Sequence, residues 1–412
     1  MFLATLTNAW LLESFRQAPA PQAIVDARAI RDALRNAGYT SRALGARVLG
    51  GTPVAAAAAP TQVLRRTKTA EGPPRDDEVD SLIALFALGL SVEKGELSAA
   101  TYDAVAPLLA EDMTARCMVA PVGALRDAGE DLYVVTDWPP EKRLITDEEP
   151  CMYLGPDSLA LADVASSLSQ GKRVADLCAG SGVQGLVATR AGAASIRWVE
   201  AEARAAAFCR LNGALNNVAG DVVVDRVSNA EAGAYDLILA NPPYVATPPS
   251  LAYDAFAAGG PDGYDVLKDV VTYAARHLAE DGLLACVFEL NGPPEALFAK
   301  LALAWASGGA WHARCCVVHD VLTERTAPEA VAERRGGVQS EAWLANYRDQ
   351  NINCVANAVL LLGRTSGGGF DWAEGACARK GAPSHVFLGL VHGSLLRLEQ
   401  GGSALGRNFG TL

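Results

Sequence analysis

The sequence has few of the residues that build metal sites and disulfide frameworks. Its 5 histidines are widely separated, and its 9 cysteines include no CxxC pair. We therefore expect no metal centre, and free thiols in a reducing cytoplasm. No apolar stretch approaches the roughly 18 residues of a membrane span, and the first residues lack the basic start and long apolar segment of a secretory signal. We expect a cytoplasmic protein with no membrane partner.

Positive charge is scarce as well. The chain has 35 Lys and Arg against 47 Asp and Glu, which gives a formal net charge of -12. An acidic surface repels a phosphate backbone, so this composition disfavours nucleic acid as a partner, although a local basic patch would still permit it. With 412 residues, of which 50% are hydrophobic, the chain is long enough for two or three domains with sizeable cores.

Residues 1–150 are predicted to form a mainly helical domain. The apolar spacing predicts helices within residues 1–58, 79–90 and 98–109, and Ser98 is expected to cap the last of them. Two short strands are expected at residues 117–119 and 132–135. The strands would form a terminal hairpin, as in a winged-helix domain. A polar linker is expected at 65–78, and its Arg65 and Arg66 are interpreted as solvated rather than as a phosphate grip.

From about residue 151 the pattern changes to strands that alternate with helices, which is typical of a doubly wound parallel sheet. Strands are expected at residues 173–177, 195–200, 222–227, 236–240, 283–289 and 354–362. One helix is expected to follow the first of these strands after a glycine turn and to end at about residue 191, and two others are expected over 203–216 and 266–278. We predict an α/β, Rossmann-like fold for residues 151–412, with a C-terminal elaboration from about residue 310.

The most informative motif is Asn241-Pro242-Pro243-Tyr244, which ends an apolar run over residues 235–240. Proline cannot continue a central strand, so the chain must leave the sheet here. The carboxyl ends of strands in an open α/β sheet are where ligands bind. Asn241 is therefore expected to present its amide at a binding site. A stiff loop with exposed carbonyls can accept hydrogen bonds from an amino group and aim its nitrogen, which favours group transfer onto nitrogen.

A glycine turn follows the first expected strand of this sheet. Gly180 and Gly182 permit a tight turn and a close approach of a ligand to the backbone, and Cys178 lies in the same turn. Together with Gly185 these glycines match GxGxxG, so they do not exclude a dinucleotide. Asp176 at the strand end disfavours one, because a carboxylate beside a pyrophosphate is repulsive. An ammonium-bearing nucleoside such as S-adenosylmethionine fits better.

Residues at or just after the ends of the next two strands complete the expected cofactor site. Glu200 ends the second strand, where an acidic side chain would accept hydrogen bonds from a ribose diol, and Glu202 is the alternative. Ser228 and Asn229 come where contacts to an adenine edge are expected.

In their order and spacing these motifs resemble those of class I S-adenosylmethionine-dependent methyltransferases. Residues 150–292 are similar to the small methyltransferase group, which includes the release-factor glutamine N5-methyltransferases. Three further segments carry the resemblance: Tyr153-x-x-Pro156-Asp157-Ser158, the pair Asn212 and Asn216, and the glycine-rich residues 258–265. Tyr153 and Asp157 would line the cofactor pocket or pack beside it. The flanking parts of the chain do not match the glutamine methyltransferases.

The resemblance implies S-adenosylmethionine as the cofactor and assigns roles in catalysis. The Asn241 side-chain oxygen and the Pro242 carbonyl would accept hydrogen bonds from the target nitrogen, and Tyr244 would stack on the planar acceptor. Because the sulfonium already activates the methyl group, the protein mainly supplies position and electrostatics, and no strong general base is needed.

Three functions stay open at this point. The first is N-methylation of an amide or amine of a protein, peptide or small molecule, which the acidic charge favours. The second is methylation of a nucleobase amino group in RNA or DNA, which would need a basic channel leading to Asn241. The third is a binding protein that keeps the fold without turnover, which the intact Asp176, Glu200 and Asn241 disfavour.

Two other groups of residues have ordinary interpretations. The pairs Cys315-Cys316 and His319-Asp320 are interpreted as sheet and loop residues rather than as a nucleophilic or metal site. The amide-rich residues 346–353, with Trp343 and Tyr347 beside them, would contribute to acceptor binding or form a surface loop.

Overall fold

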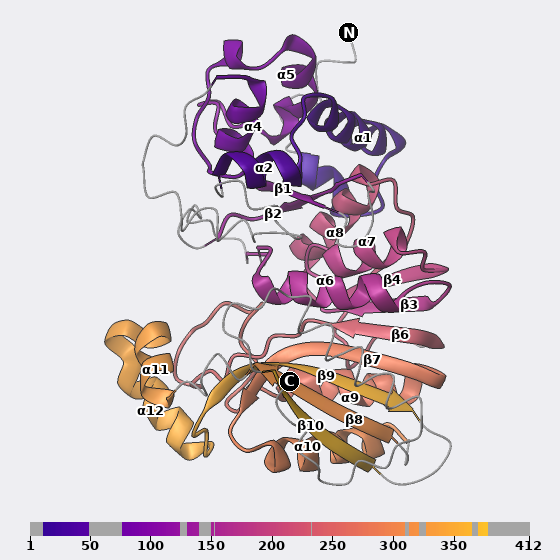
Figure 1. Cartoon of the computed structure of the whole chain (residues 1–412), viewed down its shortest axis with the longest axis vertical. Coiled ribbons are helices and arrows are strands. Elements are labelled where there is room, and N and C mark those ends of the chain that lie inside the picture. Colours follow the sequence, from indigo (N-terminus) through magenta and orange to yellow (C-terminus); the bar gives the residue numbers. More distant parts are fainter. Residues whose placement is uncertain are drawn as a thin grey trace.

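The computed structural model describes residues 11–48, 76–123, 130–139, 150–151, 153–231, 233–309, 313–320, 327–364 and 370–377. The predicted linker with Arg65 and Arg66 lies largely outside these residues. In Figure 1 the helical N-terminal part lies at one end of the molecule and a large sheet with its helices occupies the other end. No helix among the described residues combines the length and the apolar character that crossing a membrane requires.

The N-terminal part consists of short helices and an antiparallel strand pair. Its elements are η1 (Leu11–Phe15), α1 (Pro21–Asn36), α2 (Ser41–Val48), α4 (Glu78–Phe86), η2 (Lys94–Glu96), α5 (Ala99–Val105), η3 (Ala106–Leu108), β1 (Met118–Val122) and β2 (Leu132–Thr136). Ser98 caps α5, because its side chain accepts a hydrogen bond from the Thr101 N–H. β1 and β2 pair antiparallel, so the expected strand pair is present.

The rest of the chain alternates strands and helices around one sheet. Its elements are α6 (Pro156–Leu168), β3 (Arg173–Leu177), α7 (Val183–Arg190), β4 (Ser195–Glu200), α8 (Ala203–Leu215), β5 (Asp221–Val224), β6 (Tyr235–Ala240), α9 (Asp265–His277), β7 (Leu278–Asn291), α10 (Pro294–Ser307), β8 (Ala313–Asp320), α11 (Pro328–Gly336), η4 (Gly337–Gln339), α12 (Ser340–Asp349), β9 (Val355–Arg364) and β10 (Phe370–Cys377).

The sheet has 8 strands in the order β10-β8-β9-β7-β6-β3-β4-β5. Neighbouring strands are parallel except for β9, which runs antiparallel to both β7 and β8. The order reverses at β3, since β4 and β5 lie on one side of it and β6 and β7 on the other. Ligands of doubly wound sheets bind at such a reversal, beyond the carboxyl ends of the strands. The predicted α/β, Rossmann-like fold is confirmed.

Helices cover both faces of the sheet. Along β6, Leu237 and Leu239 point into the core beneath α6 and α7, whereas Ile238 and Ala240 point into the core beneath α9 and α10. Alternate side chains of a strand face opposite sides of a sheet, and burial on both sides demands an uninterrupted apolar run. The burial of β6 on both faces explains why the apolar run over residues 235–240 predicts a strand.

The N-terminal part shares a core with the sheet domain. Leu211 of α8 is buried in the same apolar cluster as the N-terminal helices. Two asparagines of α8 also bind the backbone of β2: Asn212 Oδ1 accepts from the Val135 N–H at 2.8 Å, and Asn216 Oδ1 accepts from the Tyr133 N–H at 2.9 Å. These side-chain amides form the hydrogen bonds that a neighbouring strand would form with β2, and they attach the antiparallel pair to the sheet domain.

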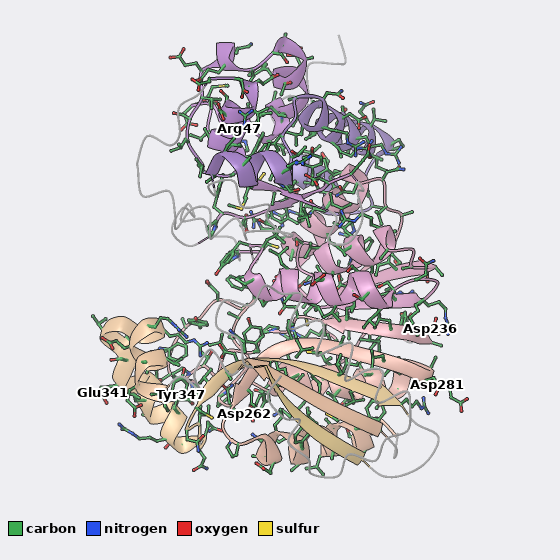
Figure 2. All side chains as sticks on the ribbon, in the orientation of Figure 1. Arg47, Asp236, Asp262, Asp281, Glu341 and Tyr347 are labelled. Atoms are coloured by element: carbon green, nitrogen blue, oxygen red, sulfur yellow. The ribbon has the colours of Figure 1, made fainter. Side chains whose placement is uncertain are left out.

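The C-terminal third of the chain contributes strands to the main sheet. β8 and β9 are members of this sheet, and among the described residues α11, η4 and α12 lie between them in the sequence. Figure 2 shows Tyr347 of α12 at the opposite end of the sheet from Asp236, the second residue of β6. The helix pair α11–α12 therefore lies on the side of the sheet where the parallel strands end.

Candidate functional site

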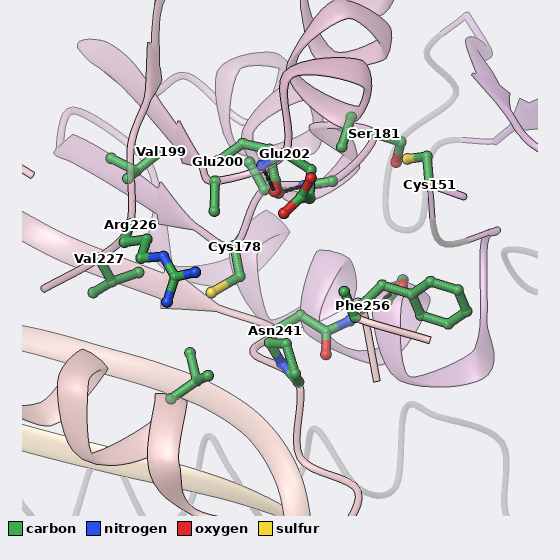
Figure 3. A pocket seen from close by; sticks show the side chains of 18 of the residues that line it. Cys151, Cys178, Ser181, Val199, Glu200, Glu202, Arg226, Val227, Asn241 and Phe256 are labelled. Carbon is green, nitrogen blue, oxygen red and sulfur yellow. Dashed lines mark hydrogen bonds between the residues drawn. The ribbon is translucent and has the colours of Figure 1, made fainter. Parts of the chain in front are cut away.

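A cavity of about 490 Å³ opens beyond the carboxyl ends of β3, β4 and β6, at the point where the strand order reverses (Figure 3). Its walls come from six segments that are distant in sequence. They are contributed by residues 150, 151, 153 and 158 and by residues within 178–184, 199–205, 225–227, 241–258 and 266–269. Small-molecule sites in proteins typically occupy about 300–1,000 Å³. The cavity is therefore large enough for a nucleoside-sized ligand.

The glycine turn forms one wall of this cavity. Gly180 and Gly182 have φ angles of 53° and 78°, in the left-handed region that glycine adopts without strain. A Cβ on Gly180 would meet no atom within 4 Å, so the backbone is open to the cavity at this position. Gly182 does not line the cavity, and a Cβ there would lie 2.7 Å from Cys209 Sγ.

Cys178 and Gly185 also belong to the glycine-turn region. Cys178 lines the cavity and has a φ of 53°, which is uncommon for a residue with a side chain. Gly185 lies inside α7, where a Cβ would be 2.2 Å from Trp198 Nε1. The third glycine of the GxGxxG pattern thus permits close packing of α7 on β4, which does not require a phosphate.

Glu200 holds the turn and also faces the cavity. Its Oε2 accepts from the Gly180 N–H at 2.7 Å, and its Oε1 accepts from the Glu202 N–H at 2.9 Å. Burial raises the pKa of Glu200, and these backbone donors oppose the rise. A carboxylate has about four acceptor positions, so Glu200 can still accept from a ligand hydroxyl. Glu202 lines the same wall, so both candidate residues reach the cavity.

Asp176 lies behind the turn rather than in the cavity wall. The side chain is fully buried, and its Oδ2 accepts from the Gly185 N–H at 2.9 Å. Burial raises the pKa of this carboxyl well above its usual range. Its Oδ1 has no hydrogen-bond partner among the described residues. In this structure Asp176 ties the end of β3 to α7 and does not line the cavity.

The two residues expected to contact an adenine edge lie outside the cavity wall. Ser228 and Asn229 are exposed and do not line the cavity, whereas Asp225, Arg226 and Val227 do. The strand β5 ends at Val224 instead of continuing to residue 227, and the chain turns so that the Asn229 N–H donates to the Arg226 carbonyl at 3.0 Å. The earlier turn carries residues 225–227 to the cavity in place of the two expected residues.

Asn241 forms the wall that joins the two ends of the cavity. In Figure 3 it lies between the side formed by Arg226 and Val227 and the side formed by Phe256. Its Nδ2 donates to Asp157 Oδ2 at 3.0 Å and to Ser158 Oγ at 3.2 Å. Its Oδ1 accepts no hydrogen bond within the described part of the chain, which leaves this acceptor available to a ligand.

The other residues of the motif lie in a different arrangement from the one expected. Pro243 lines the cavity, whereas Pro242 is buried and Tyr244 is half-buried, and neither is part of the cavity wall. The Tyr244 hydroxyl donates to Asp157 Oδ2 at 3.2 Å, and burial raises the pKa of this hydroxyl well above its usual range. Tyr244 thus contacts Asp157, the residue behind Asn241.

The loop after the motif closes the far side of the cavity, and the helix pair α11–α12 braces it. Tyr253 of this loop lines the cavity and meets Trp343 of α12 edge-on, with ring centroids 5.2 Å apart. Asn346 Nδ2 donates to the Pro261 carbonyl at 2.9 Å. Trp343 and Asn346 are buried. The amide-rich segment therefore supports the cavity wall indirectly.

A buried ion pair fastens the helix pair to the sheet. Arg335 of α11 donates to Glu289 near the end of β7, and their side chains are 10% and 7% exposed. Arg335 Nη1 also donates to Tyr347 Oη at 3.2 Å. This pair joins residues 46 positions apart in the chain, and no spacing in the sequence indicated it.

Cys316, His319 and Asp320 belong to β8, and their side chains lie outside the described part of the structure. Cys315 is buried in β8, and no group of three potential metal ligands occurs in the described ranges. Tyr153 and Ser158 line the cavity, whereas Asp157 lies behind Asn241.

Comparison with known proteins gives the following matches. Residues 157–302 match the family described as methyltransferase small domain. The chain is 34% identical over 140 residues to the release factor glutamine methyltransferase of Mycolicibacterium smegmatis, an alignment that covers 31% of this chain and 50% of that protein. It is 31% identical over 168 residues to the ribosomal protein uL3 glutamine methyltransferase of Burkholderia pseudomallei, which covers 35% of this chain and 54% of that protein.

The chain thus spans about half the length of the curated relatives it matches. Among solved structures, a ribosomal protein L11 methylase from Lactobacillus delbrueckii subsp. bulgaricus shares 16% sequence identity at a TM-score of 0.30, covering 50% of this chain and 77% of that one. A likeness at that level carries no detail of the site. The stretch that matches the family, residues 157–302, contains the glycine turn, Glu200 and Asn241.

Proposed function

We propose, from the premise that residues 157–302 form a methyltransferase small domain, that this chain is an S-adenosylmethionine-dependent N-methyltransferase whose acceptor is the side-chain amide of glutamine in a protein. The observation that carries the proposal is the hydrogen bonding of the Asn241 side-chain amide. Its NH2 group is bound by Asp157 and Ser158, and its carbonyl oxygen is left as an acceptor beside the glycine turn.

The cavity residues fit the cofactor. Glu200 has acceptor positions for a ribose diol, and the open backbone at Gly180 lets a ligand approach the turn closely. Val199 and Val227 offer apolar contacts and Asp225 an acceptor for an adenine ring. When bound, S-adenosylmethionine supplies a methyl group that its sulfonium sulfur activates for in-line displacement. The residues of this chain therefore have to bind, orient and exclude water, which is the larger part of such catalysis.

The part of the cavity around Asn241 suits a neutral acceptor. Ser158, Pro243 and Phe256 of the cavity wall lie near Asn241, and none of them carries a charge (Figure 3). An ammonium group would need a carboxylate free to pair with it, whereas the Asp157 carboxylate behind Asn241 accepts from Asn241 and Tyr244. A phosphate would need a cation at this place. A neutral amide needs only an acceptor for its N–H, which the Asn241 oxygen supplies. The same oxygen stabilises the positive charge that develops on nitrogen as the methyl group is transferred.

The balance of charge favours a protein over a nucleic acid as the acceptor. Among the described residues that line the cavity Arg226 is the one basic residue, against four acidic ones, Glu200, Glu202, Asp225 and Asp269. The described lining is therefore not the basic channel that a flipped base requires, and the net charge of -12 disfavours a phosphate backbone as well. The names of the curated relatives, which are glutamine methyltransferases of a release factor and of ribosomal protein uL3, also support a protein glutamine.

Transfer of label from [methyl-3H]S-adenosylmethionine to purified release factors and ribosomal proteins tests this proposal. Label is expected on a protein, and mass spectrometry of its peptides should place one added methyl group on a glutamine side chain. Asn241→Ala should lower the transfer rate on the order of 100-fold, because it removes a preorganised acceptor from the site. Label that appears only on RNA, or on lysine, would contradict the proposal.

A further inference from the structure

Asp157 lies directly behind the acceptor side chain and contacts two residues of its motif. It is the second residue of α6, whose first turn meets the end of β6. One oxygen, Oδ2, accepts from Asn241 Nδ2 at 3.0 Å and from Tyr244 Oη at 3.2 Å. The neighbouring Ser158 Oγ lies 3.2 Å from the same Asn241 nitrogen. Asp157 is therefore the group on which Asn241 and Tyr244 converge.

The chemistry of these partners determines which end of the Asn241 amide faces the cavity. An ionised carboxylate only accepts hydrogen bonds, so only the NH2 end of an amide can face it. The Ser158 hydroxyl both donates and accepts, so it would tolerate either end. Of the two residues, Asp157 alone gives the amide a direction. With the NH2 group turned to Asp157, the Oδ1 of Asn241 is directed away from this carboxylate.

We propose that Asp157 is a positioning residue for methyl transfer, which holds the Asn241 amide with its carbonyl oxygen toward the acceptor nitrogen. This inference rests on the function proposed above. A flipped amide would present N–H groups to the N–H groups of the acceptor, and the two sets of donors repel each other. The charge of Asp157 also polarises the amide through the hydrogen bond, which makes Oδ1 a stronger acceptor.

Tyr244 and the helix α6 hold Asp157 in turn. The Tyr244 hydroxyl donates to the same oxygen and fixes the carboxylate against rotation. The carboxylate lies in the first turn of α6, where the N-terminal end of the helix favours negative charge. This explains why Tyr244 belongs with Asn241 in the motif even though its ring does not line the cavity.

Two substitutions at this position separate positioning from folding. Asp157→Ala removes the acceptor and frees the amide to flip, so kcat for methyl transfer should fall on the order of 10- to 100-fold. Asp157→Asn keeps a carbonyl that can accept from Asn241 but adds an NH2 group that can face it, so its loss should be smaller. The affinity for S-adenosylhomocysteine should stay within about twofold in both variants, since Asp157 does not line the cavity. The matched control, Asp349→Asn at the exposed end of α12, should leave both quantities unchanged.

A spectroscopic readout tests the orientation without any methyl transfer. The Asn241 side-chain NH2 pair can be assigned in a 15N spectrum of the whole chain by its loss in Asn241→Asp. In the wild type these protons should exchange slowly with solvent, and in Asp157→Ala they should shift and exchange faster. If the wild type transfers methyl groups and Asp157→Ala does so at the same kcat, the inference is overturned and the proposed function stands.

Other results would support the orientation of Asn241 by Asp157 while contradicting the proposed function, or would contradict the positioning role itself. If the wild type transfers no methyl group but the Asn241 signals respond to Asp157→Ala as expected, the orientation is supported and the proposed function fails. If both Asp157 variants lose the thermal unfolding transition together with cofactor affinity, the residue is a structural one and the positioning role is wrong.

Discussion

Removal of the positive charge from the buried pair between Arg335 and Glu289 should destabilise the protein in a manner that depends on pH. The two side chains are 10% and 7% exposed, so water does little to solvate them. Burial raises the pKa of Glu289, and Arg335 opposes that rise. Arg335→Met keeps much of the side-chain volume but leaves the carboxyl of Glu289 without its counter-charge.

Two costs compete in this variant, and the smaller one sets the loss of stability. A charged, unpaired carboxylate in the interior costs about 3–5 kcal/mol. Protonation of Glu289 avoids that cost, but it costs about 3.7 kcal/mol at pH 7, since the reference pKa of Glu is about 4.3 and each unit is worth about 1.4 kcal/mol. The free energy of unfolding should therefore fall by about 3–4 kcal/mol at pH 7.

The sign of the pH dependence follows from the direction of the shift. Without Arg335 the folded-state pKa of Glu289 rises further above its unfolded value of about 4.3. A carboxyl with a raised pKa destabilises the fold progressively as pH rises from the unfolded pKa through the folded one. At pH 5 protonation costs only about 1 kcal/mol, so the loss should shrink to about that value.

Guanidinium chloride unfolding at pH 5 and pH 7 measures both values. Arg348→Met, on the exposed side of α12, is the matched control and should change stability by no more than about 0.5 kcal/mol. The double variant Arg335→Met with Glu289→Met should recover most of the loss, because no charge is then left unpaired. An equal loss at both pH values, or a loss below about 1 kcal/mol at pH 7, would refute this reasoning.

Three further predictions concern packing, acid stability and the acceptor wall. Gly185→Ala places a methyl group 2.2 Å from Trp198 Nε1 and should cost about 1–3 kcal/mol in a denaturant titration. The hydrogen bond from Arg173 lowers the pKa of Asp236 to about 2. Its stabilisation is present above the unfolded pKa and is lost as pH falls toward 2, so Asp236→Asn should flatten the acid unfolding profile in that window. The loss at pH 7 should stay below about 1 kcal/mol, because the pair is exposed. Trp343→Ala removes the edge-on contact to the tyrosine of the cavity wall and should raise the KM for the acceptor several-fold without changing S-adenosylhomocysteine affinity, as measured by steady-state kinetics and calorimetry.

The positions of the cavity residues at strand ends could be predicted from the sequence. Apolar runs that stop at Glu200 and at Asn241 mark the carboxyl ends of buried strands, and such ends meet at one edge of a parallel sheet. Such local signals consist of the spacing of apolar residues along the chain and of the proline and glycine residues that end a strand. Ser98 as a helix cap was predictable for the same reason.

The residues that depend on a turn or on distant contacts could not be predicted. Val222 to Val227 has the composition of a strand, but the chain turns after Val224, and that turn decides which side chains reach the cavity. The roles of Asp157 and Tyr244 depend on a contact between residues 87 positions apart. A single sequence contains no local signal for such a contact.

The central claim is that the cavity beside the glycine turn holds S-adenosylmethionine. Calorimetric titration of the full chain with S-adenosylhomocysteine tests it most directly. We predict one site per chain, with Glu200→Gln weakening the binding about 10- to 100-fold, because it removes a charged acceptor of hydrogen bonds. No heat of binding with the folded wild type, or the same affinity in Glu200→Gln, would contradict the claim.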